Sequence, residues 1–555
     1  MRRPKRLTIT AAVAAAAALV LTGCSGGGAS DDASSGTDKG GTLNILTTAT
    51  AVHLDPATSQ NLNITTLGLV LRRLTAWDVQ PGKTAKVVPD LATNTGDSSD
   101  GGKTWTYHLK KGLTFQDGTP ITTKDIKWGI ERSFAPTLTG GLSYHKSLLE
   151  GGDSYAGPFD GKTLDSIETP DDSTIVFKLN AVYGDWPWIV SMPAFAPVPE
   201  GEGTDTGAYD AKPVASGPYQ VESNTQGSQI TLVRNEEWSA KTDSVRTAGP
   251  SKVVFRESQD PSTVTQTLIA DNGDAKNSFG ATYLGAAELN QVRANPSAQD
   301  RLVTSKAGPI NYVAINTQRG SLKELKVRQA LQYAVDKKSY RIAAGGALAG
   351  TYASTLITPG IAGRQSYDLY EPGATGNVSK AKQLLREAGV SDLELTLVTQ
   401  NDSANLAEAQ AIQAGLKRAG ITVTLKPLDA DSFTTATTDG DDFDLAMFSW
   451  QPDFPSANAN IQPLYASSEI GGGGYNVSKY SNPEVDALIK EATGTIDQQD
   501  AQKLWAEADK RIMQDAPIVP LTYAKQSFLA GSDVENFRVA DFPAYPNYLK
   551  VSLAQ

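Results

Sequence analysis

Residues 105–134 read WTYHLKKGLTFQDGTPITTKDIKWGIERSF and predict a strand, a turn and a helix in close succession. Residues 105–110 alternate apolar and polar side chains, as a half-buried strand does. Asp117-Gly118 indicates a turn. Residues 122–125 have the spacing of a helix cap, and three apolar side chains of the following helix share one face (Ile126, Ile130 and Phe134). The stretch predicts a domain in which strands and helices are mixed.

The same mixture extends outward in both directions. Short runs typical of strands recur at 174–179, 230–233, 253–255 and 312–316, and a helix is expected at 322–336. The second half alternates more regularly, with a helix that Ser379 opens, a strand at 393–398, a helix at 404–419, strands at 421–425 and 443–450, and a helix capped by Ser481. No repeat of fixed period is present. This pattern favours an α/β fold with two lobes over a single barrel.

The first residues have the order of a secretory signal. Four basic side chains precede an alanine-rich apolar run, which is shorter than the ~20 residues that span a bilayer. The run ends in Leu21-Thr22-Gly23-Cys24, which resembles a lipobox, so residues 1–23 are predicted to be removed and Cys24 to carry lipid. A cleaved signal with an incidental cysteine is the alternative, and Arg2-Arg3-Pro4-Lys5 matches a twin-arginine export signal poorly.

Composition limits the classes of function. Removal of residues 1–23 leaves 532 of 555 residues, enough for two or three domains. The net charge changes from −11 to −15, because the removed segment carries four basic residues and no acidic one. An acidic surface disfavours nucleic acid as a partner. Cys24 is the only cysteine, so no disulfide is expected. Residues 24–41 are rich in Gly, Ser and Asp and predict a flexible tether.

The sequence offers little for catalysis. Its three histidines (His53, His108 and His145) lack metal-ligand spacing, and no Gly-x-Ser-x-Gly elbow is present. Gly102-Lys103-Thr104 resembles the end of a phosphate loop, but Asp97 stands where that loop needs its first glycine. We therefore predict a protein that is not an enzyme and that uses no cofactor or metal. His53 is the one histidine placed near a possible ligand loop.

Seven blocks resemble, in order, the extracellular solute-binding proteins of peptide-type ABC importers. These blocks are 105–134, 216–219 (SGPY), 327–338 (VRQALQYAVDKK), 377–390 (NVSKAKQLLREAGV), 443–455 (FDLAMFSWQPDFP), 475–492 (YNVSKYSNPEVDALIKEA) and 515–523 (DAPIVPLTY). The resemblance covers nearly all of residues 42–550. It implies an α/β, two-lobed periplasmic-binding-protein-like fold with a hinge and an inserted subdomain in the first lobe.

The resemblance also implies domain boundaries. The core of the first lobe is expected at 42–85, 210–311 and 524–555, the inserted subdomain at 86–209, and the second lobe at 312–523. The chain is expected to cross between lobes near 313–316 and 520–523. The implied role is that of an extracytoplasmic monomer, lipid-anchored to the cell membrane through Cys24, which captures peptides, expected to be oligopeptides, and delivers them to ABC permease subunits.

A peptide importer must recognise what all peptides share, which is the main chain and the terminal ammonium. In the oligopeptide-binding branch, a Trp-x-x-Asp loop follows a strand of the second lobe, and residues 450–453 match it. By that match, Asp453 would bind the α-ammonium, Trp450 would form an aromatic wall, and the backbone of Ser449 to Gln451 would pair with the ligand. The open alternative is that Asp453 caps a turn and Trp450 belongs to the core.

A second edge of the ligand cleft also resembles the family, whereas two other positions differ from it. Three polar residues after Leu54-Asp55-Pro56 resemble the opposite edge of the cleft (Ser59, Gln60 and Asn61). Met447 replaces a basic residue that can meet a ligand carboxylate, so that contact is not carried over. Residues 454–457 lack the acid-proline pair of many relatives. A metal chelate, haem or short sugar stays open as ligand, and a secreted hydrolase or a surface sensor stays open as function.

Overall fold

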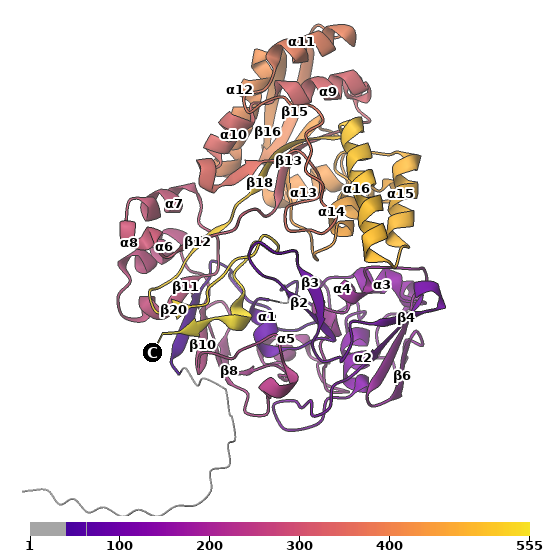
Figure 1. The fold of residues 1–555 in the computed structure, drawn as a ribbon, viewed down its shortest axis with the longest axis vertical. Coiled ribbons are helices and arrows are strands. Elements are labelled where there is room, and N and C mark those ends of the chain that lie inside the picture. Colours follow the sequence, from indigo (N-terminus) through magenta and orange to yellow (C-terminus); the bar gives the residue numbers. More distant parts are fainter. Residues whose placement is uncertain (1–39, 63, 555) are drawn as a thin grey trace, which may run out of the picture. The chain divides into compact units, whose positions relative to one another are not determined.

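The computed structural model describes residues 40–62 and 64–554 (Figure 1). The predicted signal peptide, Cys24 and nearly all of the tether lie outside the described residues. Three larger sheets organise the described part. The five-stranded sheet has the order β11-β1-β10-β9-β8, with β1 at Thr42–Leu46, β8 at Tyr219–Thr225, β9 at Gln229–Arg234, β10 at Lys252–Arg256 and β11 at Ser278–Gly280.

The four-stranded sheet contains the strand predicted at 105–110. Its order is β4-β5-β7-β6, with β4 at Asp97–Ser99, β5 at Thr104–His108, β6 at Ile167–Asp171 and β7 at Thr174–Lys178. The predicted helix is α2, Thr123–Arg132, and its N-terminus forms a capping box in which Asp125 accepts hydrogen bonds from the backbone and the hydroxyl of Thr122. Ile126 and Ile130 are buried, so the predicted apolar face is confirmed.

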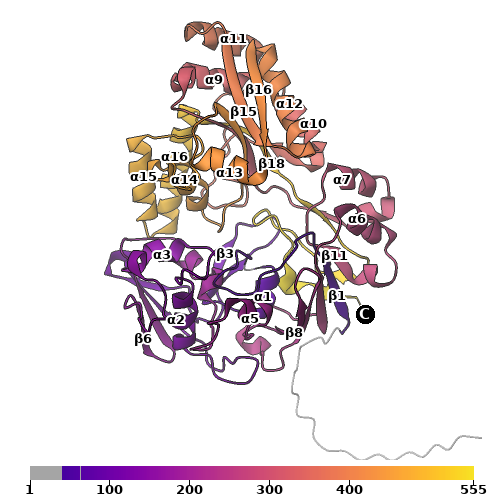
Figure 2. The ribbon, with the colours of Figure 1, turned by 180° about the vertical axis from the view of Figure 1, so that it is seen from behind.

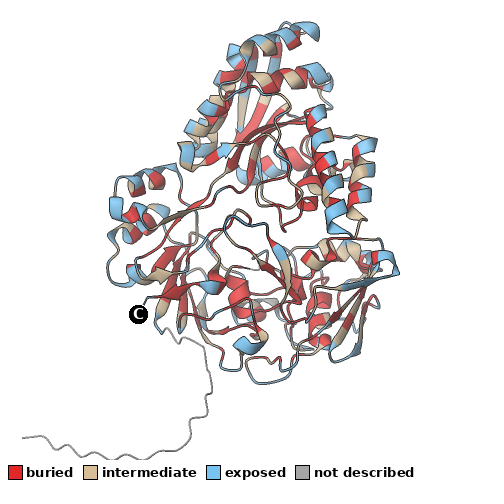
Figure 3. Ribbon diagram, in the orientation of Figure 1, coloured by how far each residue is buried: buried red, intermediate tan, exposed pale blue. Residues whose placement is uncertain are grey.

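The six-stranded sheet has the order β14-β18-β13-β17-β15-β16. Its strands are β13 at Ile310–Ile315, β14 at Gly350–Tyr352, β15 at Leu393–Gln400, β16 at Ile421–Leu428, β17 at Leu445–Trp450 and β18 at Ile518–Ala524. Helix α12, Ser403–Arg418, packs on β15 and β16, as both ribbon views show (Figures 1 and 2). β13 and β18 are buried along almost their whole length, and many residues of the helices around the sheet are exposed (Figure 3).

Three two-stranded sheets and the remaining helices complete the fold. The strand pairs are β2 (Thr75–Asp78) with β3 (Lys86–Pro89), β12 (Leu302–Thr304) with β19 (Ser527–Leu529), and β20 (Val534–Glu535) with β21 (Ser552–Leu553). The other helices are α1 at Thr66–Val70, α3 at Tyr144–Leu148, α4 at Trp186–Ile189, α5 at Thr206–Ala211, α6 at Pro261–Ala270, α7 at Ala286–Arg293, α8 at Pro296–Gln299, α9 at Leu325–Ala334, α10 at Lys337–Ala343, α11 at Val378–Glu387, α13 at Ala430–Thr438, α14 at Asn458–Tyr465, α15 at Pro483–Thr493 and α16 at Gln498–Asp515. Within the described residues, no helix combines the length and apolar character that a membrane span requires.

Two predicted helix caps are wrong by one or two residues. α11 is capped by Asn377, whose side chain accepts a hydrogen bond from the backbone of Lys380, and not by Ser379. α15 is capped by Asn482, which accepts from the backbone of Glu484, and not by Ser481. Asparagine caps as well as serine does, so two adjacent candidates cannot be ranked by residue type alone.

Two antiparallel segments connect the β12/β19 pair with the six-stranded sheet. They are residues 305–309 and 525–526, and the backbone of Ser305 donates to the carbonyl of Gln526 over 2.9 Å. The predicted crossings at 313–316 and 520–523 fall a few residues away, on β13 and β18. The domain boundaries given above stay a prediction.

The glycine of the SGPY block has a packing reason. A Cβ atom on Gly217 would lie 2.7 Å from the carbonyl oxygen of Leu69 and 2.9 Å from that of Val70, both of them backbone atoms. The backbone of Gly217 donates a 2.7 Å hydrogen bond to the same Val70 carbonyl. The turn therefore holds β8 against α1 at a distance that only glycine allows.

Beside this turn lies a buried charge network. Asp90 accepts hydrogen bonds from the guanidinium groups of Arg72 and Arg246, and all three side chains are almost completely buried. Arg246 also pairs with Asp243. Burial and the neighbouring Arg246 lower the pKa of Arg73 to about 9. The network ties the residue that follows β3 to the segment after α1 and to the stretch between β9 and β10.

Candidate ligand-binding site

Two adjoining cavities lie beside the loop that follows β17. The main compartment has a volume of about 970 Å³, and the side compartment one of about 540 Å³. Gln60, Gln451 and Asp453 line both, so the two compartments meet at these side chains. The fold therefore brings together residues from both predicted edges of the ligand cleft.

Strand β17 positions the loop. It pairs with β13 along its whole length, whereas it pairs with β15 only at Leu445 and Ala446. From Met447 to Trp450, the edge of β17 that faces away from β13 has no strand partner in the described part of the chain. Such an edge can accept the main chain of a ligand as an added strand.

Trp450 is partly buried and lines the side compartment. Its indole nitrogen donates a 2.8 Å hydrogen bond to the carbonyl of Ala459, and its ring lies 5.2 Å from that of Tyr475, centroid to centroid. The hydrogen bond fixes the indole, and the ring contributes to the wall of the compartment. Ser449 is exposed and lines neither compartment.

Asp453 lies at the junction of the two compartments. The hydroxyl of Tyr144, at the start of α3, donates a 2.6 Å hydrogen bond to its Oδ2 atom. No lysine, arginine or histidine of the described residues forms an ion pair with it. Loss of surrounding water raises the pKa of Asp453, and the Tyr144 hydroxyl opposes this by stabilising the carboxylate. The result is a partly buried carboxylate that lacks a counter-charge.

The side-chain amide of Gln451 also has a polar atom without a partner. Its Oε1 atom is buried and accepts no hydrogen bond from the described residues. Buried amide oxygens are nearly always paired in folded proteins. A donor from a bound molecule would satisfy this oxygen.

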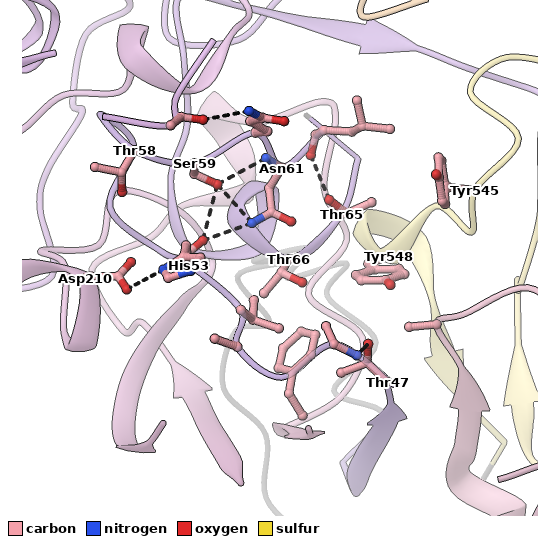
Figure 4. A pocket seen from close by; sticks show the side chains of 18 of the residues that line it. Thr47, His53, Thr58, Ser59, Asn61, Thr65, Thr66, Asp210, Tyr545 and Tyr548 are labelled. Atoms are coloured by element: carbon pink, nitrogen blue, oxygen red, sulfur yellow. Dashed lines mark hydrogen bonds and ion pairs between the residues drawn. The ribbon is translucent and has the colours of Figure 1, made fainter. Parts of the chain in front are cut away.

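The opposite edge of the cleft is held by its own hydrogen bonds (Figure 4). Ser59 is buried, donates to the carbonyl of His53 and accepts from the backbone and the amide of Asn61. Gln60 donates from its amide to the carbonyl of Gly140 over 2.7 Å. All three predicted residues line the main compartment. The polar groups of Ser59 are used within the loop, so its most direct effect is to shape the wall.

His53 and Asp210 form a pair on the same wall. Nδ1 of His53 lies 2.9 Å from Oδ2 of Asp210, and the other carboxylate oxygen accepts from the backbone of Leu54 and Asp55. Asp210 thus fixes the start of the ligand loop. His108 is exposed, and His145 is buried, with a pKa lowered to about 3 by loss of water.

Sequence reasoning missed three residues of the side compartment: Tyr144, Glu469 and Tyr475. Tyr475 opens one of the blocks that carry the family resemblance, which is the one signal that could have drawn attention to it. Tyr144 and Glu469 have no local pattern that marks them. Both become visible only when the fold places them in the compartment that Asp453 also lines.

The described residues that line the two compartments include no lysine and no arginine. The carboxylates are Asp210, Asp453 and Glu469, of which Asp210 is paired with His53. No group of three or more histidine, cysteine or acidic side chains in the described residues could hold a metal ion. The cavity can therefore offer negative charge, aromatic faces and main-chain hydrogen bonds to a bound molecule.

Comparison with known proteins decides the family. Residues 86–472 match the family described as bacterial extracellular solute-binding proteins, family 5 middle. The chain belongs to family 5 of these solute-binding proteins, which serve ABC importers. The predicted resemblance is thereby confirmed, and the family consists of binding proteins rather than enzymes.

Several known binding proteins resemble the chain over most of its length. Heme-binding protein A of Haemophilus influenzae is 28% identical over 79% of this chain and 79% of its own length. Di/tripeptide-binding protein 1 of Pseudomonas aeruginosa is 26% identical over 85% of this chain and 87% of its own. The solved structure of clavulanic acid biosynthesis oligopeptide binding protein 2 is 30% identical, with a TM-score of 0.83 over 93% of this chain and 96% of that one. The two-lobed α/β fold predicted from the sequence is confirmed.

Proposed function

We propose that this family 5 protein captures oligopeptides in the two compartments and delivers them to the permease of an ABC importer. The observation that carries the proposal is the carboxylate of Asp453, which lies at the junction of the compartments without a counter-charge. A partly buried carboxylate of this kind is stabilised by a cation that arrives with the ligand, and the terminal ammonium of a peptide is such a cation.

Two further observations support a peptide over other solutes. The free edge of β17 offers main-chain hydrogen bonds, and the Oε1 atom of Gln451 lacks a donor. Both suit the N–H and C=O groups that every peptide carries. Side chains of the ligand would occupy compartments large enough for ordered water, which weakens preference among them.

Calorimetry with the purified protein tests the proposal. Wild type, Asp453→Asn and the control Asp392→Asn, an exposed residue that lines neither compartment, would be titrated with tri- to pentapeptides. Asp453→Asn keeps the size of the side chain and removes its charge. We expect a loss of affinity above about tenfold for this variant alone, because the ligand ammonium loses its charged partner. Equal affinity in Asp453→Asn and wild type would contradict the role of Asp453.

We further propose that Cys24 anchors the mature protein outside the cytoplasm. A diacyl or triacyl cysteine holds a protein at the membrane, whereas one chain holds it only marginally. Replacement Cys24→Ala should shift the protein from the membrane fraction to the medium or the periplasm. Retention of the Cys24→Ala protein in the membrane fraction would exclude this anchor.

A further inference from the structure

The side compartment has a charge and an aromatic lining that the capture of a terminal ammonium does not require. Glu469 lines it, in the segment that follows α14. This carboxylate accepts no hydrogen bond and forms no ion pair within the described residues. Loss of water raises its pKa. A second acid without a counter-charge therefore lies in the same compartment as Asp453.

The walls next to Glu469 also suit a positive charge. Trp450 and Tyr475 lie with their ring centroids 5.2 Å apart at an interplanar angle of 56°, and both line this compartment. The face of an aromatic ring attracts a cation, and guanidinium groups stack on such faces. The buried Oε1 atom of Gln451 adds an acceptor without a donor. All of these groups favour a cationic group that donates hydrogen bonds.

The two compartments differ in whether their second carboxylate has a partner, and this difference supports a cation site at Glu469. The acid of the main compartment other than Asp453 is Asp210, which already binds His53 and two backbone amides. In the side compartment, Tyr144 donates to Asp453, and nothing among the described residues donates to Glu469. Asp453 is the partner proposed for the ligand ammonium, so Glu469 is left for a second cation.

We propose that the side compartment receives the cationic side chain of a lysine or arginine residue of the bound peptide, with Glu469 as its counter-charge. This inference rests on the proposed function and deepens it, because it names the class of peptide that the site prefers. Peptides with a single free ammonium and neutral side chains would bind, and peptides with a suitably placed basic residue would bind more tightly.

Matched peptide pairs test the inference by calorimetry. Alanine tetrapeptides with a free amino terminus would carry lysine or norleucine, and separately arginine or citrulline, at each position in turn. Each pair differs in charge and hardly in size. At one position, we expect the charged peptide to bind wild type about tenfold more tightly than its neutral partner.

The variant Glu469→Gln should remove most of this preference and leave the affinity for the neutral peptide within about twofold, because the carboxylate acts on the charged side chain alone. Retained binding of the neutral peptide shows that the variant is folded. Glu491→Gln is the matched control, since Glu491 is exposed on α15 and lines neither compartment.

The outcomes separate this inference from the proposed function. Equal binding within every pair, or a preference that survives in Glu469→Gln, would overturn the inference while peptide capture stands. Failure of every peptide to bind wild type would overturn both. A preference that is present in wild type and Glu491→Gln and lost in Glu469→Gln supports the role assigned to Glu469.

Discussion

The hydroxyl of Tyr144 donates a 2.6 Å hydrogen bond to Oδ2 of Asp453, and the two residues are 309 positions apart in the chain. Tyr144 begins α3, and Asp453 follows β17 of the six-stranded sheet. The bond stabilises the ionised carboxylate against the loss of water around it. The proposed function depends on this negative charge, which the hydrogen bond favours before a ligand binds.

Tyr144→Phe should change the pH dependence of peptide affinity. The pKa of Asp453 is already raised by burial, and loss of the donor should raise it further. Below its pKa, the carboxyl is neutral and binds an ammonium poorly, so affinity falls as pH is lowered. In the variant, this fall should begin at a higher pH, which calorimetry from about pH 4, near the ordinary pKa of aspartate, up to pH 8 would detect. A pH profile of affinity that coincides with that of wild type would refute this role of Tyr144. Tyr333→Phe is the control, because Tyr333 lines neither compartment.

Modification of the peptide ends should have unequal effects. Acetylation of the amino terminus removes the charge that Asp453 is proposed to bind, so we expect a loss above about tenfold. Amidation of the carboxyl terminus should change affinity by less than about twofold, because no lysine or arginine among the described lining residues meets that group. A large loss on amidation would place a cation at the carboxyl end.

Asp185→Asn should stabilise the fold above about pH 6. Asp185 is buried, accepts a 2.9 Å hydrogen bond from Ser456, and has a pKa raised to about 6 from its ordinary 3.8 by loss of water. A raised carboxyl pKa favours folding at low pH, and that stability is lost as pH rises from about 4 to about 6. The neutral asparagine avoids this loss of about 3 kcal/mol.

Thermal unfolding of wild type and Asp185→Asn between pH 4 and 8 would check this result. The difference in midpoint should grow up to about pH 6 and then stay constant. Asp171→Asn offers a contrast of opposite sign, because hydrogen bonds from Ser173 lower the pKa of the exposed Asp171 to about 2. A difference for Asp185→Asn that is the same at every pH would show that packing, and not charge, is responsible.

Asp90→Ala should destabilise the protein severely. Asp90 is completely buried and binds the guanidinium groups of Arg72 and Arg246. Its removal takes away one of two carboxylates and leaves Asp243 to balance both buried arginines, at a cost of about 3–5 kcal/mol. Chemical denaturation would measure the loss. The exposed Asp392→Ala should stay within about 0.5 kcal/mol of wild type, and an equally small effect in Asp90→Ala would contradict the importance of the network.

Much of the fold could be predicted because its signals are local. Alternation in residues 105–110 predicted β5, and the spacing of Thr122 and Asp125 predicted the capping box of α2. The expected helix at 404–419 is α12, Ser403–Arg418. The loop of Asp453 was found by its match to a family pattern, and the structure places Trp450, Gln451 and Asp453 at the cavities. Their roles in binding stay predictions.

The rest of the site depends on contacts between distant parts of the chain. Tyr144 is the first residue of a short helix of no distinctive pattern, and its partner lies in the other half of the sequence. Glu469 is one acid among 61 acidic residues. The errors at Ser379 and Ser481 have a different cause, because an equally good cap stands one or two residues away in each case.

The one-sided pairing of β17 has a geometric consequence for whatever binds beside it. Successive side chains of an extended chain project to opposite faces. A guest aligned along residues 447–450 would therefore present its odd-numbered and even-numbered positions to different walls. Selectivity would then alternate along the guest, and moving a residue by a single place would exchange the surroundings it meets.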